Sequence, residues 1–267
     1  MNDPEVPINS IKRSYEIINA ISKQQQSGVT KLSDTLDLPK STIHNHLQTL
    51  ETLGYLVKTN GEYRLSTRYL QLGRESRNNN EVFLHGRTVV KDLAEQLNTY
   101  NQLVIEENGR GTILLATGWQ YEHLPPSAQH VYPTHEHLHT NAPGKAILAS
   151  LPTNRVTEII EKHGLVKRTE QTITDAATLF EALSTIRAQG YAVDCGEMID
   201  GIVGVAAPIM TEETVYGAIG AYGPANEMQS ALEGDLPELV REKADSICSD
   251  IVFATHQTTN ERSNNAH

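Results

Sequence analysis

The chain has 267 residues, 38% of them apolar and 21% charged, which is the composition of a globular protein and excludes a largely disordered one. Its length suggests two domains, and no apolar run approaches the roughly 18 residues that cross a bilayer. The first residues are polar and lack the pattern of a secretory signal. The only two cysteines, Cys195 and Cys248, are too few for a disulfide scaffold or an all-cysteine zinc site. We therefore expect a soluble protein of the cytoplasm.

The net charge of −11 is distributed unevenly along the chain. Residues 1–77 hold ten of the 22 Lys and Arg and eight of the 33 Asp and Glu, so this segment carries +2 and the remainder −13. Such asymmetry indicates that the two segments meet different partners. An acidic remainder is also what adaptation to high salt produces.

Three short helices are predicted near the amino terminus. The first begins at Ser10, a favourable capping residue, and places Ile11, Tyr15 and Ile18 on one face. The second covers residues 30–36, and Pro39 starts a third after a tight connection.

The third helix is predicted over residues 40–53 and has two different sides. Its apolar residues lie within a narrow arc, and the opposite side is short, uncharged and rich in hydrogen-bonding groups. The apolar set is Ile43, Leu47 and Leu50, and the polar set is Ser41, Asn45, Gln48 and Thr52, with His44 on its flank. One side is suited to packing and the other to the major groove of DNA.

A strand pair follows this helix. Residues 55–58 and 62–65 have strand character and are joined by Asn60-Gly61, a strong hairpin signal. Three helices with a tight second turn and a two-stranded wing predict a winged helix-turn-helix.

The rest of the chain predicts an α+β domain. We expect a winged helix-turn-helix over residues 1–72, a linker over 73–83, an effector-binding domain over 84–256 and a disordered tail over 257–267. Strands lie at both ends of a helical middle, which indicates an antiparallel sheet covered by helices. The expected strands are residues 103–105, 112–116, 191–193, 203–209 and 215–221, and the expected helices are residues 84–97, 142–150, 153–163, 175–189 and 236–252.

A series of motifs resembles the IclR-type transcriptional regulators. The motifs are residues 38–44 (LPKSTIH), 50–56 (LETLGYL), 138–149 (LHTNAPGKAILA), 186–194 (IRAQGYAVD), 205–209 (VAAPI) and Gly223-Pro224. They occur in the family's order and spacing. The resemblance implies a winged helix-turn-helix, a linker helix and a GAF-like effector-binding domain, in a homodimer or homotetramer on a palindromic operator.

The resemblance also implies which residues contact double-stranded DNA. Ser41, Asn45 and Gln48 are expected to reach base edges, and Asn and Gln suit adenine. His44 is expected at a base or a phosphate. Lys40 and Arg64 are expected to contact phosphates. Thr42 is expected either to cap the helix or to touch the DNA backbone. Asp37 stands where the family often has glycine, and Asp tolerates a left-handed backbone.

The family's effector positions are carried over in the same way. They correspond here to Ala142, Pro143, Asp194, Cys195, Gly204, Gly220 and Tyr222. Amides at a helix start favour anions, although Pro143 has no N–H. Gly204 and Gly220 are expected to leave space in the pocket wall. A small organic acid or a sugar-derived metabolite is the expected effector.

Two other functions remain open from the sequence. The histidines at positions 123, 130, 135, 137 and 139 lie close together, and three of them alternate as metal ligands on a strand could. A metal-dependent enzyme would use them with Asp194 or Glu197, and a sensor or assembly module would use the helix-turn-helix for protein contacts only. A carboxylate beside Cys195 raises the pKa of its thiol, so a reactive cysteine is not expected. No catalytic motif, cofactor or metal site is predicted, and the leading hypothesis is a repressor or activator controlled by a small molecule.

Overall fold

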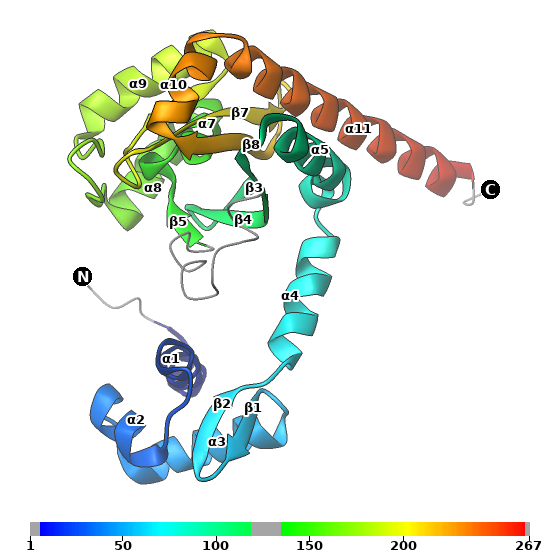
Figure 1. Cartoon of the computed structure of the whole chain (residues 1–267). Helices are drawn as coiled ribbons and strands as arrows, with labels where there is room; N and C mark the ends of the chain where they lie inside the picture. The colour runs from blue at the N-terminus through cyan, green and yellow to red at the C-terminus, as the bar shows by residue number, and fades with distance from the viewer. Residues whose placement is uncertain (1–5, 119–134, 265–267) are drawn as a thin grey trace. The chain divides into compact units, whose positions relative to one another are not determined.

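The structure is a computed structural model that describes residues 6–118 and 135–264, with residues 258–264 described as backbone only. The chain forms two compact units, residues 1–77 and 78–267. The amino-terminal unit contains three helices and a two-stranded sheet, and a fourth helix follows them (Figure 1). These elements are α1 (Asn9–Gln24), α2 (Val29–Leu36), α3 (Lys40–Thr52), β1 (Leu56–Thr59), β2 (Glu62–Leu65) and α4 (Arg68–Asn78).

The helix-turn-helix is built as the sequence predicts. Ile43 and Leu47 of α3 are fully buried in one core with residues of α1, α2 and the wing. Asp37 ends α2 in the left-handed region, at φ 51° and ψ 45°, and so makes the tight turn into α3. Asn60 and Gly61 have positive φ between the antiparallel strands β1 and β2. The wing and the turn are therefore confirmed.

The predicted apolar face of α1 is only partly correct. The residues that α1 buries are Ile17, Ala20 and Ile21. Ile11 and Tyr15 are instead 65% and 64% exposed. Their periodicity marks a second apolar stripe, which the amino-terminal unit does not cover.

The predicted linker, residues 73–83, is partly helical, because α4 begins at Arg68 and continues to Asn78. The helix forms although it buries no residue. Arg68 lies over the ring of Tyr55, 5.1 Å from its centroid, and Gln71 donates to Glu75 one turn later. Such local contacts need no apolar periodicity, which explains why hydrophobic patterning did not detect the helix. A linker helix agrees with the family resemblance.

The carboxy-terminal unit is built on one six-stranded antiparallel sheet. The strand order is β5-β4-β3-β8-β7-β6. The strands are β3 (Tyr100–Glu107), β4 (Arg110–Thr117), β5 (His135–His137), β6 (Ala192–Cys195), β7 (Ile202–Met210) and β8 (Val215–Pro224). The antiparallel α+β architecture is confirmed.

Helices cover both faces of this sheet, and each face has its own core (Figure 1). On one face α5 (Glu81–Leu97), α10 (Ala225–Glu233) and α11 (Leu236–Asn264) pack against Leu103, Val205 and Ile219. On the other face α7 (Ala142–Ser150), α8 (Thr153–His163) and α9 (Ala176–Gln189) pack against Val104, Ala206 and Ala218. A short 3-10 helix, η2 (Leu138–Thr140), precedes α7. We call the second surface the α7 face.

Three features of this unit differ from the sequence-based expectation. β5 and α10 were not predicted, because β5 is only three residues long and α10 buries a single residue, Met228. α11 ends at Asn264, beyond the expected Val252 and inside the tail that was expected to be disordered. Phe253 is 66% exposed, so the helix continues where its buried face has ended. In the described part of the chain, every helix is too short or too polar to span a bilayer.

Candidate nucleic-acid interface and effector site

The exposed side of α3 presents the residues expected to read DNA. Ser41, His44, Asn45 and Gln48 are exposed. The hydroxyl groups of Thr49 and Thr52 donate back to the carbonyls of Asn45 and Gln48, both at 2.8 Å. The helix therefore offers an uncharged surface whose carboxamide groups are exposed. The buried opposite side of α3 holds this surface in place.

The other expected DNA contacts have different surroundings. Lys40 is exposed at the start of α3, and Arg64 is exposed on the wing, where it donates to the carbonyl of Leu65 at 3.2 Å. Thr42 is half-buried and makes no capping hydrogen bond. His46, which was not singled out, contacts Ser14 of α1 at 2.8 Å and so helps to hold α3 on α1.

Six of the seven expected effector positions lie on the α7 face of the sheet. Asp194, Gly204, Gly220 and Tyr222 occupy neighbouring strands in register, and Ala142 and Pro143 start α7 above them. Cys195 is the exception. It follows the buried Asp194 in β6, so its side chain points to the opposite face of the sheet and is exposed. Partial loss of hydration, followed by the carboxylates of Glu197 and Asp194, raises the pKa of this thiol although the residue is exposed.

Tyr222 occupies the space that the two glycines leave. A Cβ on Gly204 would lie 2.3 Å from the Tyr222 ring, and one on Gly220 would lie 3.3 Å from it and 2.9 Å from Pro143. The hydroxyl oxygen of Tyr222 accepts a hydrogen bond from the backbone N–H of Ala142 at 2.9 Å. The expectation that Gly204 and Gly220 leave open space is therefore wrong for this structure, because the phenol ring lies against both.

The first turn of α7 has no unused backbone donor. Ala142 donates to Tyr222, Pro143 has no N–H, and Gly144 donates to the side chain of Asn141 at 2.9 Å. The expectation that these amides are available to a carboxylate does not hold in this arrangement.

Asp194 is buried at the end of β6, with 2% of its surface exposed. Its Oδ1 accepts hydrogen bonds from the backbone N–H groups of Gly196 and Glu197, at 3.0 and 2.7 Å. Burial raises the pKa of this carboxyl to about 7, because lost hydration outweighs the amide hydrogen bonds. Near neutral pH both protonation states are therefore present.

Sequence reasoning missed the ion pair beside this carboxyl. Lys145 of α7 is 3% exposed, pairs with the carboxylate of Glu197 and donates to the carbonyl of Val193 at 2.8 Å. The pair connects α7 to the turn that follows β6. Thr169 and Thr172 hold the same turn through the carbonyls of residues 196 and 197. The sequence feature that could have pointed to Lys145 is its place in the Gly144-Lys145 motif, and that feature is weak evidence for a buried ion pair.

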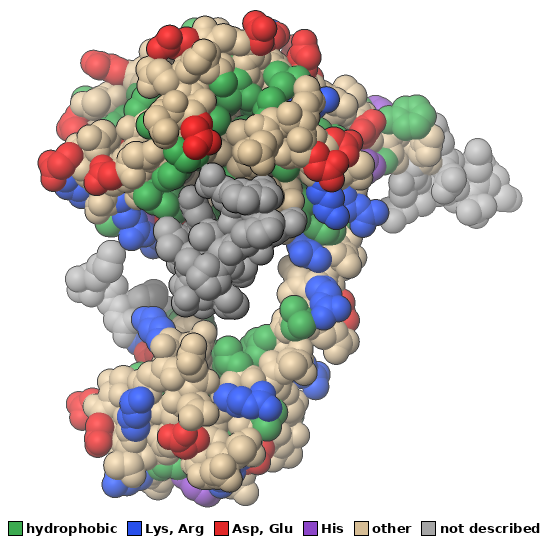
Figure 2. Space-filling view, viewed as in Figure 1, with side chains coloured by type: hydrophobic (Ala, Val, Ile, Leu, Met, Phe, Trp, Pro, Cys, Tyr) green, Lys and Arg blue, Asp and Glu red, His purple; other side chains and the backbone are tan. Residues whose placement is uncertain are grey.

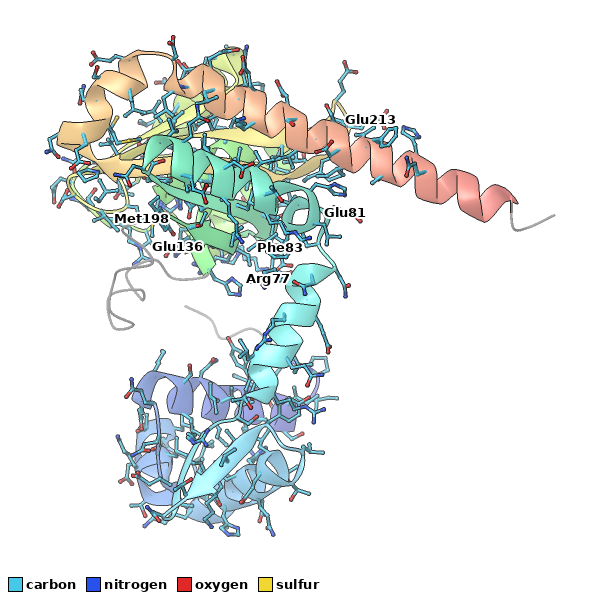
Figure 3. All side chains as sticks on the ribbon, turned by 45° about the vertical axis from the view of Figure 1, so that its right-hand side comes forward. Arg77, Glu81, Phe83, Glu136, Met198 and Glu213 are labelled. Atoms are coloured by element: carbon cyan, nitrogen blue, oxygen red, sulfur yellow. The ribbon has the colours of Figure 1, made fainter. Side chains whose placement is uncertain are left out.

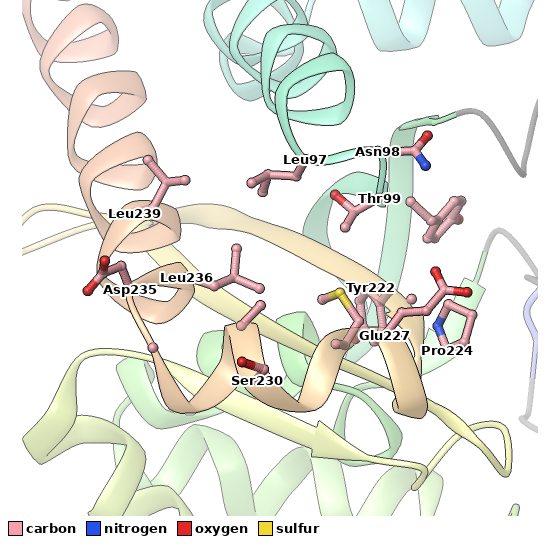
Figure 4. A pocket seen from close by; sticks show the side chains of 15 residues that line it. Leu97, Asn98, Thr99, Tyr222, Pro224, Glu227, Ser230, Asp235, Leu236 and Leu239 are labelled. Carbon is pink, nitrogen blue, oxygen red and sulfur yellow. The ribbon is translucent and has the colours of Figure 1, made fainter.

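A cavity of about 500 Å³ lies between the end of α5, α10 and the start of α11 (Figure 4). Leu97, Met228 and Leu236 supply apolar walls, and Glu227 and Asp235 lie on opposite sides of it. Tyr222 is the one expected effector residue among its lining residues. This cavity was not anticipated from the sequence.

The histidines of residues 135–139 lie at and just after the edge strand β5, and they contact neighbouring residues of the protein. His135 contacts the Thr112 hydroxyl at 3.0 Å, and His139 contacts the carbonyl of Val166 at 3.1 Å. His139 lies in η2 and not in β5, so the three alternating histidines do not share one strand. Burial and nearby cations, Arg110 first, lower the pKa of His137 to about 4.

A buried carboxyl accompanies these histidines. Glu136 of β5, labelled in Figure 3, is 3% exposed and lies 3.5 Å from Arg168. Burial raises its pKa, and Arg168 opposes the shift. Among the described residues no group of three His, Cys, Asp or Glu side chains is placed to hold a metal ion. His123 and His130 lie outside the described residues.

The charge asymmetry is visible on the surface. Lys and Arg side chains gather along α4, and Asp and Glu side chains are spread over the visible face of the carboxy-terminal unit (Figure 2). The basic residues of α4 are Arg68, Arg74 and Arg77.

Comparison with known proteins identifies both units. The model of the IclR helix-turn-helix domain matches residues 10–59. The model of the bacterial transcriptional regulator IclR C-terminal domain matches residues 86–249, more than half of the chain. The chain belongs to the IclR family. IclR proteins are transcriptional regulators and not enzymes, so the metal-enzyme alternative has no support.

Individual IclR-family relatives cover almost the whole chain. One is the probable HTH-type transcriptional regulator ArcR of Halobacterium salinarum, 32% identical over 90% of this chain and 92% of its own length. The crystal structure of a transcriptional regulator from Rhodococcus sp. RHA1, RHA06195, has a TM-score of 0.74 at 22% identity and covers 92% of this chain and 99% of that one. An IclR homologue of Microbacterium hydrocarbonoxydans, complexed with 4-hydroxybenzoate, has a TM-score of 0.72 at 22% identity over 91% and 98%. These structures share the IclR fold.

Proposed function

We propose that this IclR protein binds a palindromic DNA site through α3 and the wing, and that a small molecule in its carboxy-terminal domain changes the affinity for that site. The observation that carries the proposal is the exposed, uncharged side of α3, where the carboxamides of Asn45 and Gln48 have no hydrogen-bond partner among the described residues. The carboxamide of Asn or Gln can form two hydrogen bonds with the edge of an adenine in the major groove. Lys40 and Arg64 are suited to phosphates.

A homo-oligomer is part of the proposal. One recognition helix reads only a few base pairs, so useful specificity needs two half-sites. The uncovered stripe of α1 supports an assembly, because Ile8, Ile11 and Tyr15 are each more than half exposed. Apolar groups at such exposure are suited to contact with a second copy. The protein is then expected in the cytoplasm, where its DNA is found.

The effector class follows from the family. The 4-hydroxybenzoate complex concerns that homologue alone, and it supports a small organic compound as the type of ligand. The candidate binding residues here are those of the α7 face: Ala142, Pro143, Asp194, Gly204, Gly220 and Tyr222.

A footprinting and gel-shift experiment tests the proposal. Full-length protein is incubated with fragments of its own genome at several salt concentrations. We expect protection of a palindrome whose half-sites lie about one helical turn apart or a multiple of that. Failure to bind any fragment would leave the alternative of a module that uses its helix-turn-helix for protein contacts.

A further inference from the structure

The cavity between α5, α10 and α11 is open to solvent and has a buried end (Figure 4). Its volume of about 500 Å³ is within the range of small-molecule sites. Asn98, Ser230 and Ala231 line it and are exposed, so a ligand can reach it from solvent. Tyr100 and Tyr222 line it at the ends of β3 and β8 and are 8% and 4% exposed.

Three helices supply apolar surface to this cavity. Leu97 ends α5, Met228 lies in α10, and Leu236 and Leu239 lie in the first turn of α11. Methylene groups of a ligand gain free energy at such a surface, because contact removes apolar area from water.

Two carboxylates lie on opposite sides of the cavity, Glu227 in α10 and Asp235 before α11 (Figure 4). Neither side chain has an ion pair or a hydrogen bond with a described residue. Of the described residues that line the cavity, none is a lysine, arginine or histidine. Arg241 of α11 does not line it and is paired with Glu238 at 2.5 Å. The protein therefore leaves both carboxylates without a counter-charge.

Helix ends do not neutralise these two charges. The starts of α10 and α11 lie at the cavity and carry about half a positive elementary charge each. The ends of α5 and α10 also lie there, at Asn98 and Gly234, and carry about half a negative charge each. Neither of these two helices has a basic residue in its last turn. The helix contributions cancel, and the charges of Glu227 and Asp235 remain.

The separation of the two carboxylates follows from α10. Glu227 is in the first turn of this helix, and Asp235 follows its last residue, Glu233, by two positions. At about 1.5 Å per residue, the helix from Glu227 to Glu233 extends about 9 Å. A linear molecule with a cation at each end matches this arrangement, since its middle then lies along the apolar walls.

We propose that this cavity binds a linear diamine, with one ammonium group at Glu227, the other at Asp235 and the methylene chain against Met228 and Leu236. Primary amines are protonated near neutral pH, so both ends of the ligand carry charge. Apart from Tyr222, the lining residues are not candidate effector positions, so this is a second small-molecule site in the carboxy-terminal unit. The proposal does not depend on DNA binding.

Calorimetric titration of the full-length protein without DNA, at low salt concentration, tests the proposal. The probes are putrescine and cadaverine, with butylamine, butanediol and succinate as partners of the same chain length as putrescine. We expect one diamine per chain, bound about fivefold or more tightly than butylamine, and no binding of the diol or the diacid. Equal binding of butylamine and the diamines, or many weak diamine sites spread over the acidic surface, contradicts the proposal.

The Glu227→Gln and Asp235→Asn variants test the two ends of the site. Each change keeps the size of the side chain and removes one charge, so putrescine should bind about fivefold more weakly, at the level of butylamine. Glu238→Gln is the matched control, because Glu238 is also acidic in the first turn of α11 but is paired with Arg241 and does not line the cavity. An unchanged preference for the diamine in both site variants overturns the assignment.

A variant that fills the cavity separates binding inside it from attraction to the acidic surface. Ala231→Phe places a ring in the cavity without changing any charge and should abolish diamine binding. Gln229→Phe adds the same ring to an exposed position of α10 that does not line the cavity, and it should bind as the parent does. Thermal unfolding of both variants verifies that they are folded. Diamine binding that persists in a folded Ala231→Phe protein places the ligand elsewhere and refutes the proposal.

Discussion

At the scale of single residues, Asp194 has the most strongly perturbed carboxyl on the α7 face. Its pKa is raised from an ordinary value of 3.8 to about 7 by burial, although two backbone N–H groups donate to it. Between these values the folded chain holds a proton that the unfolded chain releases. The free energy of unfolding therefore decreases as the pH rises through this window.

The Asp194→Asn variant tests this pH dependence. Asn keeps an acceptor for the Gly196 and Glu197 amides but cannot ionise. His137, with a pKa lowered to about 4, acts in the opposite direction between about pH 4 and 6.5 and is present in both proteins, so the difference between them isolates Asp194. Denaturant unfolding should show the variant gaining stability relative to the parent from pH 4 to pH 7. A constant difference would contradict the raised pKa.

Asn45 and Gln48 carry the prediction on DNA specificity. Replacing either by Ala should relax the preference at its base pair by about 1–3 kcal/mol. Binding to operators with single base changes, measured at fixed salt concentration, checks this. His46→Ala is the comparison, because His46 is half-buried on the same helix and its ring contacts Ser14 of α1 at 2.8 Å. If affinity and preference both stay unchanged in the Asn45 and Gln48 variants, the reading side is misassigned.

At the scale of elements, α7 depends on a close approach to η2. A Cβ on Gly144 would lie 2.1 Å from the carbonyl oxygen of Leu138. That contact involves backbone, so one of the two elements must move.

The Gly144→Ala variant should therefore lose about 1–3 kcal/mol of stability or more. Gly73→Ala is the control for the substitution itself, because nothing lies within 4 Å of a Cβ there, and in α4 it should stabilise by up to about 1 kcal/mol. Unfolding of the full chain measures both. A Gly144→Ala protein as stable as the parent would contradict the tight packing of α7 on η2.

Elements with local signals were predictable from the sequence. The turn at Asp37, the hairpin at Asn60-Gly61 and α7 from Ala142 to Ser150 all follow from capping, turn chemistry and periodicity. α4 and α10 carry almost no buried surface, so apolar patterning did not reveal them. The hydrogen bond from Ala142 to Tyr222 joins residues 80 positions apart. No local pattern encodes such a contact, so the closure by Tyr222 was not foreseen, although six of the seven expected effector positions lie on the α7 face.

At the scale of the whole molecule, the chain is acidic, and only a few cations are expected at the DNA interface. The chain has a net charge of −11, and the cations expected at phosphates are Lys40 and Arg64. Each phosphate contact releases condensed counterions, so binding should weaken steeply as salt is added.

Lys40→Ala and Arg64→Ala should each reduce the slope of log affinity against log salt concentration by about 0.9 and should weaken all sequences alike. Lys91→Ala removes the same charge from an exposed position of α5 in the other unit and should leave the slope unchanged. Fluorescence anisotropy with a labelled operator at several salt concentrations checks this. Equal slopes in all four proteins would exclude Lys40 and Arg64 as phosphate contacts.

The fit of the Tyr222 ring against Gly204 and Gly220 constrains how this protein can evolve. A side chain acquired at Gly204 while Tyr222 is present would overlap the ring, and losing Tyr222 first would leave a hollow above two glycines. Neither single exchange is neutral, so the three positions should change together among descendants. The order in which side chains can be exchanged here is therefore set by steric overlap among these three sites.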